Sequence, residues 1–395
     1  MSYLLHLCCT RCDHVFDAAQ VQSYCHNCQA PLLAVYDLDH LRQRVDRDEF
    51  RRRPPGMWRW QELLPVKILE HVLSLGEGDT PLLHLPRLGA VLGLTALYVK
   101  DESRNPTGSF KARGMAAAIS KARELGIRKV IVPTAGNAGG ALAAYAARGG
   151  LQARIYMPKD TPLANVKESR ITGAEVLLVD GLISDAAALA GEDSRAGGWF
   201  DVSTFKEPYR VEGKKIMGYE LAEAGSWRLP DVIIYPTGGG TGLVGMWKAF
   251  AEMESLGWLE SPSRPRMVVV QAEGCAPVVN AFQSGADTCE FWDAAHTIAV
   301  GLRVPKSFAD RLILQCLRDS SGTAIAVSDA AILAAQKQLA MQEGIFAAPE
   351  GAATLAGLII LKEQGWVGVN ERVIIFNTGM GLKYLDVQPA GLTGS

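Results

Sequence analysis

One lysine of this chain has a setting that suits a reactive amine. Lys111 lies between Phe110 and Ala112 in the stretch "ESRNPTGSFKARG", directly after a Pro-Thr-Gly turn. The amine of lysine is nucleophilic when it is neutral, and burial lowers its pKa toward that state. Most lysines are instead solvated or ion-paired at a protein surface. The apolar neighbours favour a buried Lys111 whose amine reacts.

Three glycine-rich turns each follow a short apolar run. They are "PTAGNAGG" at residues 133–140, "PTGGGTGL" at 236–243 and "NTGMGL" at 377–382. Glycines let the backbone approach a ligand closely, and N–H groups at the start of a helix attract an anion, most often phosphate. Tight packing explains one such turn equally well, but three at equivalent strand ends indicate a ligand site. No acidic residue closes a following strand about twenty residues on, and no Gly-Lys-Ser/Thr ends a turn, so neither nucleotide-binding motif fits.

A reactive lysine and an anion-binding turn, in a chain without a nucleotide motif, suggest pyridoxal 5'-phosphate (PLP) held as a Schiff base. PLP serves as an electron sink, while the protein orients it and moves protons. Lys111 is therefore expected to be both the anchor of the cofactor and the base.

The elements that must position these residues alternate between two patterns. Ala-rich amphipathic segments, such as residues 112–125 and 139–148, separate short buried runs. The runs expected to be strands are residues 97–100, 130–133, 153–157, 176–179, 199–202, 232–235, 267–270 and 373–376. This alternation predicts an α/β fold in which helices cover both faces of parallel sheets. Ligands bind such sheets at the carboxyl ends of the strands, where the three turns lie.

Five of the eight cysteines lie in the first 28 residues. Two Cys-x-x-Cys pairs, separated by twelve residues, have the spacing of a four-thiolate zinc ribbon: Cys9, Cys12, Cys25 and Cys28. A structural zinc ion is expected there, with disulfides as the alternative and with Cys8 and His26 as competing ligands. Because four protein ligands leave no open position, a catalytic zinc is not expected.

Length and composition limit the class of protein. The 395 residues allow two or three domains, with 48% hydrophobic and 21% charged residues and no run of about 18 apolar residues. A net charge of −2 gives no general reason to bind nucleic acid or an anionic membrane. The N-terminus has neither the basic start nor the cleavage site of a secretory signal, so a cytoplasmic location is expected. The expected partner is a small molecule.

Six motifs together carry a resemblance to a known family. They are "NPTGSFKARG", "PTAGNAGGA", "GGGTG", "VEGKK", "HTIAVGLRVP" and "FNTGMGLKYL". With the cysteine pairs before them, they resemble the threonine synthases, which belong to the fold-type II PLP enzymes related to the tryptophan synthase β chain. The resemblance extends from the cysteine pairs to about residue 385.

The resemblance implies a site, residue by residue. Lys111 matches the Schiff-base lysine and Phe110 a residue beside the cofactor. Cofactor-binding positions are expected at Asn137, at the phosphate loop Gly238, Gly239, Gly240, Thr241 and Gly242, and at Thr378 facing the pyridine nitrogen. Substrate-binding positions are expected at Thr134, Ala135, Gly136, Asn137 and Ala138 for the carboxylate and at Arg210 for the phosphate. For Arg210, an ion pair with Glu207 or Glu212 is the alternative.

The resemblance also implies a reaction, the conversion of O-phospho-L-homoserine and water to L-threonine and phosphate. Ala135, Ala138 and Gly239 depart from it, because many threonine synthases carry side-chain donors at these positions. The alternatives are a serine or threonine ammonia-lyase, a β-replacement enzyme acting on another amino acid such as O-phosphoserine, and a non-catalytic binding protein that keeps the fold.

The chain is expected to have three parts and to form a dimer. Residues 1–50 are expected to form the zinc-ribbon-like segment, residues 51–114 and 205–395 a large PLP-binding α/β domain, and residues 115–204 a smaller inserted α/β domain. The active site is expected between the two domains, and relatives imply a homodimer.

Overall fold

Two compact units make up the chain in the computed structural model, which describes residues 1–386. The first unit comprises residues 1–79, 105–223 and 244–262, and the second comprises residues 80–104, 224–243 and 263–386. Parallel strands with helices between them are present in both units, which confirms the predicted α/β class. The boundaries of the three-part organisation stay a prediction.

The N-terminal part of the first unit is a small antiparallel sheet in the order β2-β1-β3. Its strands are β1 (Leu4–Cys9), β2 (Val15–Phe16) and β3 (Leu32–Tyr36). Cys9 pairs with Leu32, and Leu7 pairs with Phe16. Short helices follow: α1 (Leu38–Arg44), η1 (Arg47–Arg52), η2 (Met57–Leu63) and η3 (Leu69–His71).

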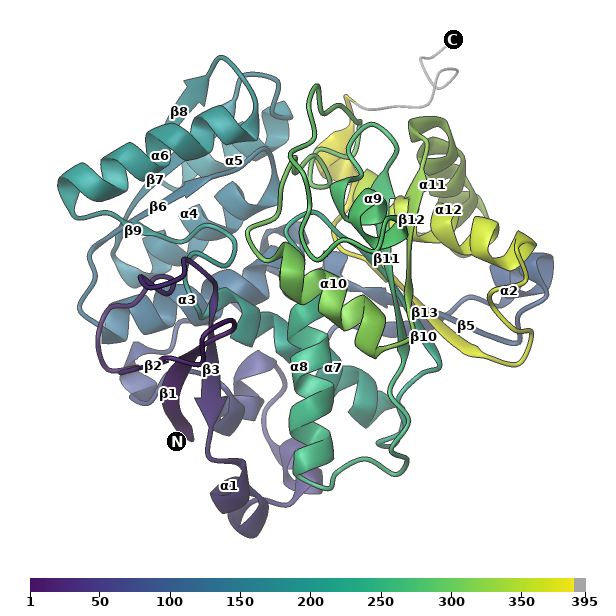
Figure 1. The fold of residues 1–395 in the computed structure, drawn as a ribbon, viewed down its shortest axis with the longest axis horizontal. Coiled ribbons are helices and arrows are strands. Elements are labelled where there is room, and N and C mark those ends of the chain that lie inside the picture. Colours follow the sequence, from purple (N-terminus) through teal and green to yellow (C-terminus); the bar gives the residue numbers. More distant parts are fainter. Residues whose placement is uncertain (387–395) are drawn as a thin grey trace. The chain divides into compact units, whose positions relative to one another are not determined.

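A parallel four-stranded sheet in the order β8-β7-β6-β9 is the larger sheet of the first unit. Its strands are β6 (Lys129–Pro133), β7 (Gln152–Pro158), β8 (Glu175–Val179) and β9 (Phe200–Asp201). The helix α6 (Ile183–Gly197) packs on Ile131 and Tyr156 through Ala186 and Ala190, while α4 (Asn137–Gly149) and α5 (Leu163–Ile171) pack on the sheet and on each other (Figure 1). The turn η5 (Pro106–Gly108) and the helices α3 (Lys111–Glu124) and α7 (Arg210–Ala224) belong to the same unit.

The second unit contains a six-stranded sheet in the order β12-β11-β10-β13-β5-β4. Its strands are β4 (Leu82–His84), β5 (Ala96–Asp101), β10 (Val232–Pro236), β11 (Arg266–Ala272), β12 (Thr323–Val327) and β13 (Arg372–Asn377). All neighbours are parallel except β4 and β5. The other elements are η4 (Glu102–Arg104), α2 (Pro86–Leu92), α9 (Pro277–Gln283), α10 (Asp310–Asp319), α11 (Asp329–Glu343), α12 (Pro349–Glu363) and η6 (Gly381–Tyr384).

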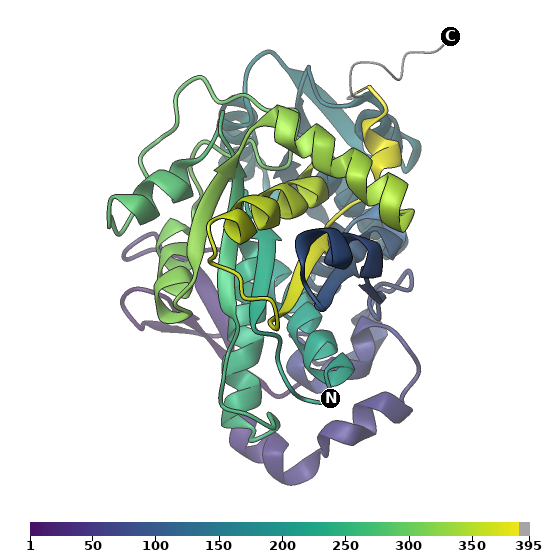
Figure 2. The same cartoon turned by 90° about the vertical axis from the view of Figure 1, so that its right-hand side faces the viewer.

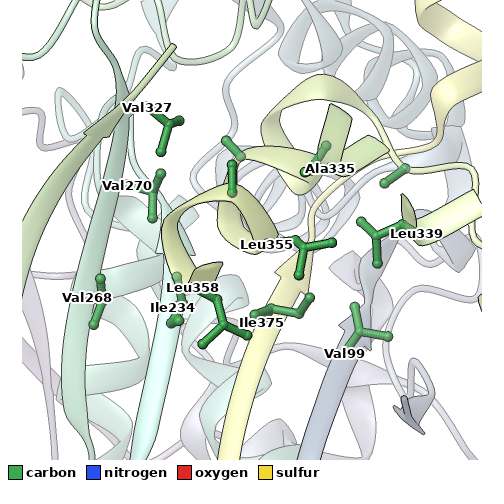
Figure 3. Close-up of a cluster of buried hydrophobic side chains, with 14 of the residues drawn as sticks. Val99, Ile234, Val268, Val270, Val327, Ala335, Leu339, Leu355, Leu358 and Ile375 are labelled. Carbon is green, nitrogen blue, oxygen red and sulfur yellow. The ribbon is translucent and has the colours of Figure 1, made fainter. Parts of the chain in front are cut away.

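Hydrophobic burial holds one face of the six-stranded sheet against helices (Figure 2). Leu355 and Leu358 of α12 face the strand residues Ile234 and Ile375, and Leu339 of α11 extends the same cluster (Figure 3). Fully burying an aliphatic side chain of this size contributes about 1.5–3 kcal/mol. This packing fixes the carboxyl ends of β10 and β13, where two of the glycine-rich turns begin.

The helix α8 (Thr241–Ser255) starts in the second unit and continues from residue 244 in the first. Within residues 1–386, no helix has the length and apolar character needed to cross a bilayer.

Candidate active site

The turn before Lys111 places its amine at the start of a buried helix. Thr107 and Gly108 both have φ near +60° in this turn, and Lys111 is the first residue of α3. Residues 112–122 of α3 are all buried. Because this helix is packed on every side, the position of Lys111 is set by the protein core.

A second amine lies beside the expected Schiff-base lysine. Lys111 Nζ is 4.5 Å from the centre of the Phe110 ring, and Lys214 Nζ is 4.4 Å from the same centre. Lys214 has no exposed surface. Burial, with the charges of Lys111 and Arg210, holds the pKa of Lys214 well below its usual range. Lys214 was not predicted, although it belongs to the quoted motif "VEGKK".

Arg210 lies one helical turn before Lys214 and is also buried, with 2% of its surface exposed. Its Nη1 donates a hydrogen bond to the carbonyl oxygen of Val202 at 2.6 Å. Its Nε is buried and has no hydrogen-bond partner among residues 1–386. An unpartnered buried N–H costs about 1–3 kcal/mol, so this group is a candidate for contact with a ligand.

Neither carboxylate expected to pair with Arg210 does so in the described part of the chain. Glu207 accepts hydrogen bonds from the backbone N–H groups of Tyr209, at 2.7 Å, and of Arg210, at 3.1 Å, and so caps α7. Glu212 forms ion pairs with Lys215 and Lys248, at 2.7 and 2.9 Å. Burial raises the pKa of Glu207 to about 7, although the Arg210 charge opposes the shift.

The asparagine turn between β6 and α4 is buried and closely packed. Thr134 Oγ1 accepts a hydrogen bond from the N–H of Gly136 at 3.1 Å, and Asn137, the first residue of α4, is 9% exposed. A Cβ on Gly139 would lie 2.4 Å from Met157 Cε. The helix α4 contacts η5, so this turn and Lys111 belong to one packed region of the first unit. Ala135 and Ala138, also in the turn, offer no side-chain donor.

The loop between β10 and α8 forms a cradle that only glycine fits. A Cβ on Gly238 would lie 2.5 Å from the carbonyl oxygen of Gly301, and one on Gly242 would lie 1.9 Å from Tyr235 Oη. Gly240 has φ of +80°, where a side chain is strained. The loop opens a helix of fifteen residues, so its backbone N–H groups suit a phosphate.

Glu350 positions this loop from α12. Its Oε1 accepts hydrogen bonds from the N–H of Gly301 at 2.7 Å and from Tyr384 Oη at 3.1 Å. Gly301 is the residue that a Cβ on Gly238 would touch. The Glu350 carboxylate therefore links Gly301, which lies against the glycine-rich loop, to Tyr384 of the same unit.

Thr378 follows β13 and is 4% exposed. The preceding Asn377 donates from Nδ2 to Asp101 Oδ1 at 2.8 Å, which fixes the start of the turn. A hydroxyl at this position provides a neutral partner for a ring nitrogen. The glycine cradle and this hydroxyl fit a phosphorylated pyridine cofactor.

The four cysteines of the predicted ribbon come together. The Sγ atoms of Cys9, Cys12, Cys25 and Cys28 all lie within 4.8 Å of one another. The Cys9–Cys28 and Cys12–Cys25 Sγ separations are 3.4 and 3.6 Å, so the sulfurs are free thiols and not disulfides. A tetrahedral zinc ion with Zn–S bonds of about 2.3 Å needs sulfurs about 3.8 Å apart, so the cluster fits this ion. Cys8 and His26 lie outside the cluster.

Comparison with known proteins identifies the class first. Residues 73–379 match the family described as pyridoxal-phosphate dependent enzymes. The structure of maize serine racemase superposes with a TM-score of 0.66 at 24% identity, covering 76% of this chain and 88% of that one, which supports the fold. The α/β fold and this match define a PLP-dependent enzyme.

The threonine synthase of Methanocaldococcus jannaschii is 35% identical over 379 residues, or 96% of this chain and 93% of the relative. That of Methanosarcina acetivorans is 35% identical over 381 residues, or 96% of this chain and 92% of the relative. The chain belongs to the threonine synthase family of PLP-dependent lyases, which confirms the resemblance seen in the sequence.

Proposed function

We propose that the chain converts O-phospho-L-homoserine and water to L-threonine and phosphate. The observation that carries this proposal is the buried guanidinium of Arg210, whose Nε lacks a partner among residues 1–386. Buried cations are stable only when an anion compensates them. A substrate with a phosphate group supplies that anion, whereas serine and threonine carry no second anionic group.

PLP, when bound, supplies the electron sink for the α-carbon of the substrate. We assign the covalent attachment of PLP to Lys111 and the contact with its 3-hydroxyl group to Asn137. Phe110 is assigned a place beside the cofactor. The loop Gly238, Gly239, Gly240, Thr241 and Gly242 is assigned to its phosphate, and Thr378 to its ring nitrogen. The glycine cradle described above supports the phosphate assignment, because its bare backbone is open to an anion.

The residues of the chain then perform three tasks on the substrate. The residues assigned to its carboxylate are Thr134, Ala135, Gly136, Asn137 and Ala138. Lys111, released when the substrate binds, would remove a proton from the α-carbon, give that proton up, and then remove one from the β-carbon. Arg210 neutralises the phosphate that departs from the γ-carbon, before water adds at the β-carbon. One amine that reaches two adjacent carbons is the geometric requirement of this reaction.

Further assignments complete the proposal. Cys9, Cys12, Cys25 and Cys28 are proposed to hold a structural zinc ion. Free thiols suit a reducing compartment, which supports a cytoplasmic location. We propose a homodimer by analogy with the family, and no nucleic-acid or membrane partner because the net charge is only −2.

A product assay tests the proposed function. PLP-loaded protein is incubated separately with O-phosphohomoserine, threonine, serine and O-phosphoserine, and phosphate, amino acids and oxo-acids are quantified. We expect threonine and phosphate in equal amounts from O-phosphohomoserine alone. Formation of 2-oxobutyrate, pyruvate or a substituted amino acid from another substrate, without turnover of O-phosphohomoserine, would contradict the proposal.

A further inference from the structure

We propose that Lys214, together with Arg210, binds the phosphate group of the substrate. This inference rests on the proposed function, because it assigns a ligand to the phosphate that the proposed substrate carries. The motif that contains Lys214 was noted in the sequence, but no role was assigned to either of its lysines.

The geometry brings Lys214 and Arg210 to one face of α7. They are four residues apart, so their side chains lie one above the other on this helix. Lys214 Cε lies 3.0 Å from where a Cβ would stand on Gly114 of α3. The glycine makes room for the lysine stem, and the packing directs its ammonium to the Phe110 ring. The amine therefore lies beside the same ring as Lys111 and is fully buried.

The charge balance at this place favours an anionic ligand. Lys111, Arg210 and Lys214 contribute three basic groups. The charges of Glu207 and Asp201 act on Arg210, and the charge of Glu207 also acts on Lys214. Because burial raises the pKa of Glu207 to about 7, this carboxylate compensates them incompletely at neutral pH. A phosphate dianion would add a favourable charge beside these basic groups.

Lys214 also resolves the departures from the family pattern. Ala135, Ala138 and Gly239 lack the side-chain donors that many threonine synthases carry there. A lysine ammonium has three donors and a full charge, so a single Lys214 compensates for several neutral donors. The specificity for a phosphorylated substrate would then come from α7 and not from the glycine-rich turns.

Binding of phosphate should change the protonation of Lys214. Its pKa is lowered by burial and by the neighbouring charges of Lys111 and Arg210. A bound dianion acts in the opposite direction and raises that pKa. Phosphate binding is therefore expected to favour proton uptake at Lys214, by linkage.

The test measures inorganic phosphate binding to the PLP-loaded protein by calorimetry, in phosphate-free buffers of different ionisation enthalpy. Lys214→Gln should weaken phosphate binding at least about tenfold, because a charged hydrogen bond contributes about 1.5–3 kcal/mol. It should also raise KM for O-phosphohomoserine, abolish the proton uptake and leave the cofactor absorbance unchanged. Lys214→Arg should bind phosphate without proton uptake, because arginine stays charged.

Lys206→Gln is the matched control, because it removes a partly exposed lysine four residues before Arg210 that pairs with Asp201 at 3.6 Å. Its phosphate affinity should equal that of the unmodified chain. Unchanged affinity and proton uptake in Lys214→Gln would overturn the proposal, as would weaker cofactor binding with unchanged phosphate affinity. If Lys214→Gln does not fold, Lys214→Arg provides the test. The proposal would then be overturned if phosphate binding to Lys214→Arg took up as many protons as binding to the unmodified chain. Phosphate binding without threonine formation would instead contradict the proposed function.

Discussion

At the scale of single residues, the ring of Phe110 contacts the amines of both Lys111 and Lys214. Its ring attracts a cation by about 0.5–2 kcal/mol, which is less than the desolvation of a buried ammonium costs. Burial therefore outweighs the attraction of the ring and favours the neutral form of Lys214, in agreement with its lowered pKa. A neutral amine is the form of Lys111 that bonds to a carbonyl group and accepts a proton.

Lys111→Ala should abolish covalent attachment of the cofactor and reduce threonine formation by about 10³-fold or more, because attachment and base are lost together. The measurements are threonine formation and the colour that borohydride fixes to the chain. Lys206→Ala serves as the control and should retain both. Cofactor colour still fixed by borohydride in Lys111→Ala would contradict the assignment of this lysine.

The sequence could reveal those site residues that stand close to other site residues along the chain. Lys111, Asn137 and Gly238 stand in short motifs with fixed neighbours, so their candidate roles were predictable. Lys214 meets a residue far along the chain, because its side chain on α7 reaches the ring of Phe110 at the start of α3. Such contacts depend on packing between elements, and no local pattern encodes them.

At the scale of elements, α7 has an unusual start. Glu207 caps the helix with its carboxylate while burial raises the pKa of that carboxylate to about 7, from an ordinary value of 4.5. Between about pH 4.5 and 7, the folded chain therefore binds more protons at Glu207 than the unfolded chain does. The contribution of Glu207 to stability is present below pH 4.5 and is lost as the pH rises to 7.

Glu207→Gln should remove this pH dependence. The free energy of unfolding of the unmodified chain should fall, relative to that of the variant, by about 3 kcal/mol between pH 4.5 and 7. Urea unfolding of both chains at several pH values measures the difference. Glu290→Gln, at an exposed position, should keep the slope of the unmodified chain. An identical slope in Glu207→Gln would show that this carboxyl group titrates normally.

The loop between β10 and α8 makes a second prediction at this scale. Gly242→Ala should weaken PLP binding about tenfold or more, because its Cβ would stand 1.9 Å from Tyr235 Oη and force the loop to shift. Cofactor titration followed by absorbance measures the effect. Gly191→Ala in α6 is the control, since its Cβ meets only Arg195 Nη1, at 3.4 Å. Equal cofactor affinity in both variants would contradict the cradle.

The strands show where the sequence pattern was sufficient. The runs at residues 232–235 and 373–376 are buried on both faces and became β10 and β13. The pattern missed β12, whose "TAIAV" is partly exposed at the edge of its sheet, and β4, which has no buried residue. Edge strands lack the continuous apolar run that identifies a central parallel strand.

At the scale of the whole molecule, the N-terminal ribbon is part of the core of the first unit. Leu7 and Phe16 of its sheet share a hydrophobic cluster with Ala118 of α3 and with Tyr209, the residue before Arg210. The ring of Tyr36 lies 3.8 Å from Lys215 Nζ on α7. The ribbon therefore supports both helices that carry the basic groups of the candidate site.

Loss of the proposed zinc ion from the ribbon should therefore affect substrate binding as well as the stability of the ribbon. We expect a sheet this small to depend on the proposed zinc ion, so a chelator or Cys12→Ser should lower Tm by several degrees. Because Tyr209 precedes Arg210, either change should also raise KM for O-phosphohomoserine more than it weakens PLP binding. Cys8→Ser is the control, since Cys8 lies outside the thiol cluster, and it should keep one zinc ion per chain in elemental analysis. Destabilisation by a reducing agent but not by a chelator would instead indicate disulfides and contradict the metal site.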